Sequence, residues 1–270
     1  LFRSAGGTPV EVVCGTEQNF KLTAAQLRKA VTPRTKWLIL NSPSNPTGAG
    51  YCADELRELG EELLRHPHVY VLTDDMYEHL RYDGWEFSTI ASVVPELYDR
   101  VLTVNGVSKA YAMTGWRIGY AGGPQHLIAA MATIQSQSTS NPCSIAQAAA
   151  VAALDGPMEF LAERNQVFAQ RRDLCLDAFH ATPGLHCRRP EGAFYLFPNC
   201  SGLVGKTTEK GEHLNNDADI SRFLLEQGRV AVVPGSAFGA GGYFRISFAT
   251  ATERLEEACR RIRTACESLK

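Results

Sequence analysis

Short apolar runs alternate with longer amphipathic stretches along most of the first half of this 270-residue chain. The runs mostly lack polar alternation, which favours strands buried on both faces, as in a largely parallel sheet. The segments that predict strands are Val10–Val13, Trp37–Asn41, Val69–Thr73, Val101–Val104 and Trp116–Ala121.

Helical patterns lie between several of these strands. Thr23 with Gln26 resembles a capping box in front of Leu27, and Asp54 is expected to cap a helix that carries Leu56 and Leu59. Strands that alternate with helices predict an α/β layered domain with right-handed crossovers.

The pattern changes after Pro142. An alanine-rich helix is expected at Ile145–Leu154, followed by one long helix from Pro157 to about His180. Alternating segments and a final amphipathic helix with Leu255, Cys259, Ile262, Cys266 and Leu269 on its apolar face then predict a smaller α+β domain. We therefore expect a large domain at residues 1–165 and a connecting helix with a small domain at 166–270.

Composition excludes several classes of protein. The formal net charge of −2 and the 44% hydrophobic content are ordinary for a globular protein and give no reason to expect nucleic acid or a membrane as a partner. The eight cysteines include no C-x-x-C pair and the seven histidines show no ligand spacing, so neither a disulfide framework nor a metal site is expected. These features predict reduced thiols and a cytoplasmic protein.

The chain opens at Leu1 without an initiator methionine and runs directly into the first expected strand. We interpret it as part of a longer fold.

Polar residues follow three of the expected strands. Asn45, Asp74 with Tyr77, and Lys109 come shortly after separate apolar runs, so parallel strands would place them at one carboxyl edge, where open α/β sheets bind ligands. Each residue also has a structural explanation: a turn for Asn45, helix capping for Asp74, core packing for Tyr77 and solvation for Lys109.

Lys109 and Arg117 form a second pattern. A lysine at the end of a buried strand is costly unless its amine is used, and an imine to an aldehyde, with an arginine holding an anionic group of the same molecule, is one such use. Arg117 is alternatively a surface arginine that leads into a strand.

Four strings strengthen this interpretation: NSPSNPTG, DDMYEHL, SKAYAMTGWRIGY and FRISFAT. Together with GGTPVEV, PEGAFYLFP and VVPGSAFG, they resemble the signature set of pyridoxal-phosphate aminotransferases of fold type I, and are most similar to the bacterial aspartate aminotransferases. The likeness covers essentially the whole chain. It implies a three-layer α/β/α large domain with a smaller α+β C-terminal domain.

The resemblance also implies roles around the cofactor, pyridoxal 5′-phosphate. Lys109 would form the imine with the cofactor aldehyde and act as the base of the proton transfer, while Asp74 would pair with the pyridine nitrogen. Tyr77 and Asn45 would hydrogen-bond the phenolic oxygen of the ring.

Further roles concern anionic groups. Arg117 would hold the cofactor phosphate, and Ser108 either adds a contact to that phosphate or caps the turn. Arg245 would bind the substrate α-carboxylate, and Asn45 is also expected to bind the substrate. By itself Arg245 would suggest a cross-strand salt bridge. In relatives Phe194 and Tyr195 lie near the substrate, and core packing is expected for at least one of them.

Two departures from the family pattern matter. Complete relatives have about a further third of chain before the position of Leu1, so we expect this 270-residue piece alone to be inactive. The arginine that recognises the side-chain carboxylate in animal-type enzymes is missing, because Gln135–Ser138 occupies that region. The expected function is transamination between aspartate and 2-oxoglutarate by a homodimer.

Two alternative functions remain open. One is a pyridoxal-phosphate C–S β-lyase on the same scaffold, which would release ammonia and a thiol. The other is an aminotransferase-like sensor domain of a transcription regulator, which an upstream DNA-binding module would indicate.

Overall fold

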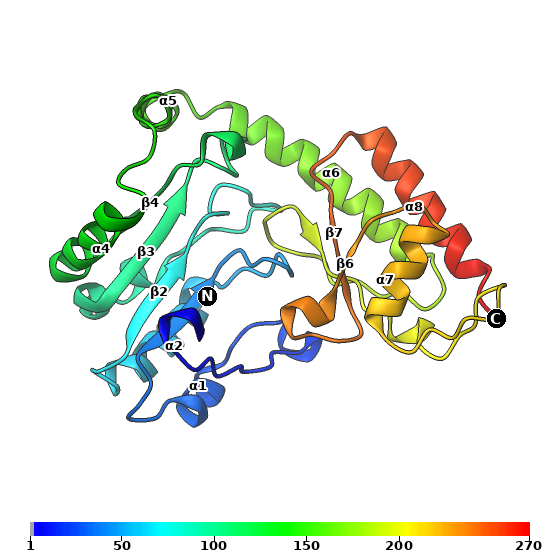
Figure 1. Ribbon diagram of the computed structural model, residues 1–270, viewed down its shortest axis with the longest axis horizontal. Coiled ribbons are helices and arrows are strands. Elements are labelled where there is room, and N and C mark those ends of the chain that lie inside the picture. Colours follow the sequence, from blue (N-terminus) through cyan, green and yellow to red (C-terminus); the bar gives the residue numbers. More distant parts are fainter. Residues whose placement is uncertain (1–2) are drawn as a thin grey trace. The chain divides into compact units, whose positions relative to one another are not determined.

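A computed structural model describes residues 3–270, which fold into two compact units (Figure 1). The first unit comprises the described chain up to Asn41, Tyr51–Met76 and Phe87–Val151; the second comprises Ser42–Gly50, Tyr77–Glu86 and Ala152–Lys270. These units differ in extent from the domains 1–165 and 166–270 expected from the sequence, and that division stays a prediction. Two short segments inside the first half of the chain belong to the second unit.

The first unit is built on a four-stranded sheet in the order β1-β2-β3-β4 (Figure 1). The strands are β1 (Trp37–Asn41), β2 (Tyr70–Asp74), β3 (Val101–Gly106) and β4 (Gly119–Gly122). The first three run parallel, and β4 returns antiparallel to β3. Parallel strands separated by helices confirm the predicted α/β class.

The first unit also contains five α-helices, the last of which ends just beyond it. They are α1 (Ala24–Ala30), α2 (Ala53–Leu64), α3 (Ile90–Val93), α4 (Gln125–Ser138) and α5 (Ser144–Leu154), with short 3-10 turns at Arg3–Ala5, Thr16–Gln18, Pro95–Arg100 and Thr114–Trp116. The capping box at Thr23 and Gln26 is confirmed at the start of α1. Asp54 does not cap α2: the N-cap is Cys52, whose backbone N–H donates to the Glu55 carboxylate at 2.8 Å, and Asp54 lies in the first turn.

One strand prediction fails in this unit and another is confirmed only in part. Val10–Val13 forms no strand, and Val10 and Val13 are 72% and 75% exposed because no described strand pairs with the segment. The segment Trp116–Ala121 begins as a 3-10 turn, so only its later part enters β4. A strand needs a partner ladder, which local hydropathy does not reveal.

One buried cluster of the first unit lies on one face of the sheet. Leu40 and Val71 pack with Leu56, Leu59 and Leu63 of α2 in one buried cluster. Trp37 and Ile39, on the alternate positions of β1, are 38% and 41% exposed. The prediction that strands are buried on both faces is therefore wrong for β1, whose side chains alternate between the cluster and solvent within the described chain.

The second unit combines three helices with a small sheet. The helices are α6 (Phe160–His180), α7 (Asp217–Glu226) and α8 (Thr252–Glu267), and the strands are β5 (Tyr195–Leu196), β6 (Val233–Pro234) and β7 (Phe244–Ser247), with 3-10 turns at Ser201–Leu203 and Gly235–Phe238. The sheet order is β5-β7-β6 and both pairings are antiparallel. The five residues expected on the apolar face of the last helical segment are all buried, as predicted.

A buried arginine organises part of the second unit. The Arg172 side chain has no exposed surface, and its guanidinium donates to both carboxylate oxygens of Asp83, at 2.7 and 3.0 Å, and to Asp173 at 2.8 Å. It also lies 5.1 Å from the centroid of the Tyr82 ring. The guanidinium of Arg172 holds the pKa of Asp83 below its ordinary value.

Replacing Arg172 with methionine should lower the free energy of unfolding by roughly 2–4 kcal/mol, since the change removes a buried hydrogen-bonded cation. Chemical denaturation followed by circular dichroism measures this loss. The control is Arg254→Met at an exposed position of α8, which should stay within about 0.5 kcal/mol of the parent. Equal stabilities of the two variants would contradict the assigned role of Arg172.

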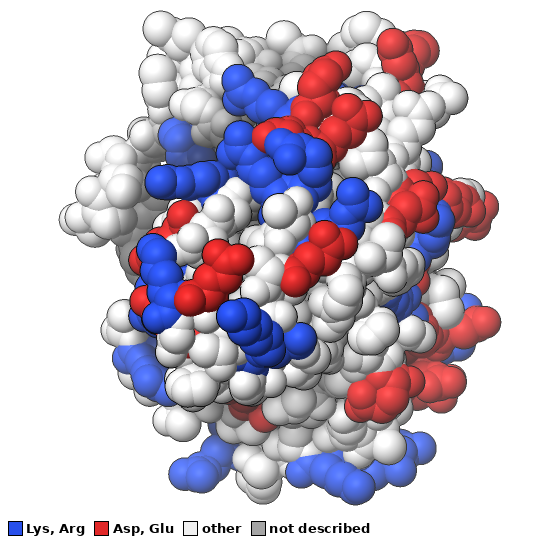
Figure 2. Space-filling view, turned by 90° about the vertical axis from the view of Figure 1, so that its right-hand side faces the viewer, with Lys and Arg blue, Asp and Glu red and all other residues white. Residues whose placement is uncertain are grey.

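Surface charges of both signs are interspersed on the face drawn in Figure 2. Local helical pairs, such as Arg260 with Glu257 at 2.6 Å on α8, bring charges of opposite sign together. The drawn face therefore presents no extended field of one sign. Within residues 3–270, no helix is both long and apolar enough to cross a membrane.

Candidate active site

The carboxyl ends of the parallel strands bring two predicted residues to one edge of the first unit. In the β1–β2 register Asn41 lies opposite Asp74, and the Asn41 side-chain amide donates to the Asp74 carbonyl at 2.9 Å. Asp74 in turn lies opposite Val104 of β3, and Lys109 follows the end of β3 in a turn. Asp74 and Lys109 consequently occupy the same edge of the sheet.

The electrostatics of Asp74 reflect this position. Partial burial raises the pKa of the Asp74 carboxyl, while a hydrogen bond from the Met76 backbone N–H at 3.2 Å and the positive charge of Lys109 lower it. Burial is the largest of these effects. An acid in this state gains stability from a further positive charge placed beside it.

The adjacent Asp75 has a different environment. Its side chain is almost fully buried and accepts a hydrogen bond from the Thr73 hydroxyl at 2.6 Å. Its backbone N–H donates to the Val104 carbonyl at 2.9 Å. The chain then forms a turn at Met76–His79 rather than a helix, so capping does not explain the paired acids. Asp75 ties β2 to β3 and leaves Asp74 as the candidate for ligand contact.

Ser108 and Arg117 are the other candidates of the first unit. Ser108 is half-buried in the turn that carries Lys109. Arg117 is exposed, has a φ of 56° and donates from its guanidinium to the Thr114 carbonyl at 3.0 Å. The left-handed backbone at Arg117 ends the 3-10 turn and starts the approach to β4.

The second unit holds the remaining predicted residues. The Arg245 guanidinium donates to the Asn45 side-chain oxygen at 2.7 Å, across a separation of 200 positions in the sequence. Tyr77 is buried, and its hydroxyl lies 3.0 Å from the hydroxyl of Tyr195. The cross-strand salt bridge considered for Arg245 is not its observed contact in this unit: it binds an amide oxygen and two aromatic rings.

The two rings belong to Tyr195, which the sequence placed either in the core or near the substrate, and to Phe238, to which it assigned no role. The guanidinium carbon of Arg245 lies 4.6 Å from the Tyr195 ring centroid and 5.1 Å from that of Phe238. Phe238 is part of the VVPGSAFG string, yet nothing in its local pattern indicated contact with Arg245. Aromatic faces near a guanidinium stabilise its charge and hold its plane.

Phe194 and Tyr195 both make core contacts. Phe194 packs against Phe168 and against Tyr77, with ring centroids 6.0 and 5.6 Å apart. Tyr195 is 6% exposed, and it also carries the hydroxyl contact to Tyr77. Core packing therefore applies to both residues, and Tyr195 adds polar contacts to it.

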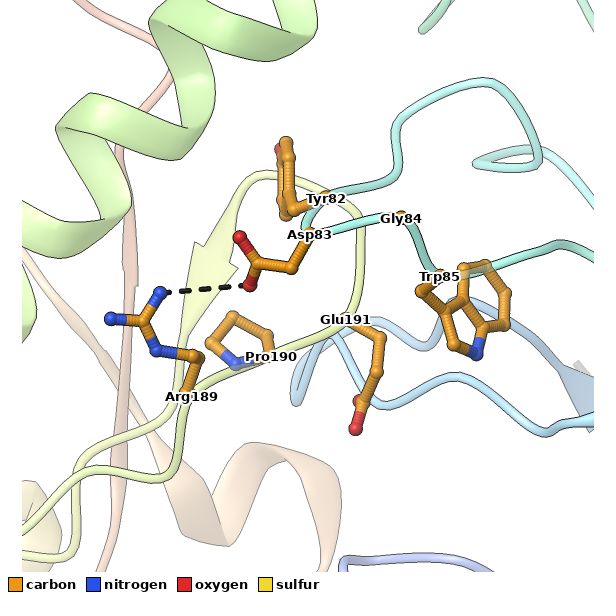
Figure 3. A pocket seen from close by; sticks show the side chains of 7 residues that line it. All are labelled: Tyr82, Asp83, Gly84, Trp85, Arg189, Pro190 and Glu191. Carbon is orange, nitrogen blue, oxygen red and sulfur yellow. Dashed lines mark ion pairs between the residues drawn. The ribbon is translucent and has the colours of Figure 1, made fainter.

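A cavity of about 360 Å³ lies elsewhere in the second unit (Figure 3). Its walls include Tyr82, Trp85 and Glu191, and Arg189 forms an ion pair with Asp83 at 3.6 Å across it. None of the candidate residues lines this cavity. Its charged groups are already engaged in ion pairs, so we do not assign the chemistry to it.

The chain is similar to known proteins over nearly its whole length. The family model described as aminotransferase class I and II matches residues 1–262. An aspartate aminotransferase of Rhizobium meliloti (strain 1021) is 58% identical over 263 residues, which are 97% of this chain and 64% of the relative. An aspartate/prephenate aminotransferase of Cereibacter sphaeroides is 58% identical over 98% of this chain and 66% of its own length.

Solved structures show the same relationship. The crystal structure of the aspartate aminotransferase from Rhizobium meliloti matches with a TM-score of 0.95 and 57% identity, over 98% of this chain and 66% of that one. An aromatic aminotransferase from Pyrococcus horikoshii matches with a TM-score of 0.89 and 39% identity, over 97% of this chain and 68% of the other.

The chain belongs to the class I and II aminotransferases and has the α/β fold of the fold type I aspartate aminotransferases. It spans 64% of the length of the Rhizobium meliloti relative.

Proposed function

We propose that the protein containing this chain is a pyridoxal-phosphate-dependent aminotransferase that transfers an amino group between L-aspartate and 2-oxoglutarate, as a cytoplasmic homodimer. The observation that carries the proposal is the placement of Lys109 and a partly buried Asp74 at one strand edge. The names of the relatives at 58% identity support the reaction and the choice of aspartate.

The residues of the first unit fit the cofactor chemically. Burial raises the pKa of Asp74, so a protonated pyridine nitrogen beside it would stabilise the carboxylate. Lys109 supplies a primary amine whose charge already reaches Asp74. An amine that can bond an aldehyde and an acid that can hold a cationic ring are the two groups that this cofactor needs from a protein.

Bound pyridoxal phosphate supplies an aldehyde and an electron-accepting ring. The chain's own task is then to hold the ring and to move a proton. The Lys109 amine would be the base that takes up the proton from the substrate Cα. Asp74 would hold the ring nitrogen in its protonated form.

The family resemblance gives the remaining candidate residues their proposed roles. Asn45 and Tyr77 would donate hydrogen bonds to the phenolic oxygen of the ring and favour its anionic form. Arg245 binds the α-carboxylate through two parallel N–H donors, with its plane held by Asn45 and by aromatic rings.

Arg117 and Ser108 are assigned to the cofactor phosphate. An exposed guanidinium and a hydroxyl next to Lys109 can both donate to phosphate oxygens. Arg117 and Ser108 would thus hold the cofactor by its phosphate.

Replacing Arg245 with lysine should raise the KM for both the amino acid and the 2-oxo acid by about tenfold to a hundredfold, because a lysine cannot form the bidentate carboxylate contact. Steady-state kinetics with each substrate varied in turn measures this effect. An exposed-site change, Arg222→Lys on α7, serves as the control and should leave both constants unchanged. A rise in KM for only one substrate would contradict a shared α-carboxylate site.

The reaction itself is tested by product analysis with the purified holoenzyme. We expect one 2-oxo acid to form for each amino group transferred to 2-oxoglutarate, without release of ammonia or thiol. Release of ammonia and a thiol from a cysteine conjugate, without amino transfer, would identify a β-lyase instead. Binding of an amino acid with no turnover would favour the sensor domain.

A further inference from the structure

Tyr195 contacts two candidate residues of the second unit, Arg245 and Tyr77. Its ring lies 4.6 Å from the guanidinium carbon of Arg245, and its hydroxyl lies 3.0 Å from that of Tyr77. We propose that Tyr195 is a positioning residue, which holds Arg245 for the substrate carboxylate and directs the Tyr77 hydroxyl proton toward a ligand oxygen. This inference rests on the function proposed above.

The strand register explains the contact with Arg245. Tyr195 of β5 lies directly opposite Ser247 of β7. Ser247 and Arg245 alternate with Ile246, so they point to the same face of β7, and Arg245 is the diagonal neighbour of Tyr195 on that face. The guanidinium therefore reaches the ring without leaving the sheet, and the ring limits the orientations of its plane.

The hydrogen bond between the Tyr77 and Tyr195 hydroxyls has a direction that follows from the role of Tyr77. Tyr77 and Tyr195 are 4% and 6% exposed, so their hydroxyls sit in a largely dry environment where a hydrogen bond is strong. If Tyr77 donates to a ligand oxygen, its own oxygen must act as the acceptor in the pair, and Tyr195 is the donor. Donation from Tyr195 makes Tyr77 a stronger donor in turn, because hydrogen bonds in a chain polarise one another.

Aromatic packing fixes the geometry of this pair. The Tyr77 ring meets the rings of Tyr195 and Phe194 edge-on, at 5.9 Å and 77° and at 5.6 Å and 83°. Phe194 and Tyr195 themselves lie 4.7 Å apart. Three mutually packed rings leave Tyr77 little freedom to turn its hydroxyl away. The polar contacts of Tyr195 are consequently held in place by its neighbours.

Two substitutions separate the ring from the hydroxyl. Tyr195→Phe keeps the ring beside Arg245 and removes the donor to Tyr77, whereas Tyr195→Leu removes both. Tyr243→Phe is the matched control: the Tyr243 ring stacks on Phe197 at 5.0 Å in the same unit and has no assigned role at the site. The holoenzyme is titrated from pH 5 to 10 while the absorption of the bound cofactor is recorded, and the Kd of maleate, an unreactive dicarboxylate, is measured.

We expect Tyr195→Phe to raise the pKa of the cofactor absorption change by about 0.5–1 unit, the equivalent of one hydrogen bond, with the maleate Kd within about twofold of the parent. Tyr195→Leu should give the same shift and weaken maleate about 3-fold to 30-fold. The control should match the parent in both measurements. A Tyr195→Phe variant that titrates like the parent overturns the inference.

The same experiment keeps the two proposals apart. If the parent protein shows no cofactor absorption that changes with pH, the proposed function itself fails, whatever Tyr195 does. If the parent titrates and binds maleate but neither Tyr195 variant differs from it, only the positioning role is wrong. Should Tyr195→Leu fail to fold, Tyr195→Phe alone decides the direction of the hydroxyl pair.

Discussion

Lys109→Ala should lower the turnover of the holoenzyme by at least about 10³-fold, because the change removes both the covalent anchor for the cofactor and the base that moves the substrate proton. Lys109 is half-buried in a turn after β3 rather than in the core, so the fold should survive. Amino-transfer assays give the activity, and circular dichroism checks the fold.

Two further variants make this result specific. Lys109→Arg keeps a positive charge near Asp74 but cannot form an imine, and it should be as inactive as Lys109→Ala. Lys29→Ala changes an exposed lysine of α1 and should leave turnover unaffected. Substantial activity of Lys109→Arg would mean that Lys109 contributes charge alone, which would refute its covalent role.

Asp74→Ala should reduce turnover by roughly 10²–10³-fold, as removal of one preorganised electrostatic partner does in other active sites. Without the carboxylate, nothing on this chain would hold the ring in its protonated form, in which the ring would accept electrons best. Asp54→Ala at an 85% exposed position of α2 is the control. Near-normal rates for Asp74→Ala would contradict the pairing of Asp74 with the ring.

Removal of the Asp74 charge should lower turnover, but it should not lower the stability of the cofactor-free protein. Burial raises the pKa of Asp74 in the folded state, so at pH 7 the folded state carries a carboxylate that is more stable in the unfolded chain. Asp74→Asn should then leave the free energy of unfolding at pH 7 unchanged or slightly higher. The advantage of the variant should vanish as the pH falls through the folded pKa, because Asp74 itself then becomes neutral.

The agreement between sequence and structure is best in the parallel strands. Trp37–Asn41 was predicted with the bounds that β1 has, and Val69–Thr73 and Val101–Val104 came close to those of β2 and β3. These segments are short and apolar and end in polar turns, so their pattern already contains their boundaries. Val10–Val13 has the same pattern, and it fails because a strand also needs a partner.

The candidate site residues also differ in how far the sequence alone predicts their positions. Asp74 and Lys109 are found from the sequence because both follow apolar runs, and parallel pairing then places them at one edge. The contact between Asn45 and Arg245 joins positions 200 residues apart, and the ring of Phe238 reaches Arg245 from a different turn. Such contacts depend on tertiary packing, which residue spacing alone does not contain.

The helix caps show how far the local sequence predicts where a helix begins. Thr23 and Gln26 were recognised because a threonine followed by a glutamine is a known capping pair. At α2 the cap fell on Cys52 rather than Asp54, because the Glu55 carboxylate receives the Cys52 backbone N–H and starts the helix earlier. Because Asp54 and Glu55 are both acidic and lie in the same turn, the sequence alone does not show which residue caps the helix.

Reduction of the holoenzyme with borohydride, followed by proteolysis and mass spectrometry of the peptides, determines whether Lys109 bonds the cofactor. We expect a stable pyridoxyl adduct on the peptide containing Lys109, at a stoichiometry near one per chain. An adduct on a different lysine, or an unmodified Lys109 in a protein that retains its cofactor absorption, would contradict it.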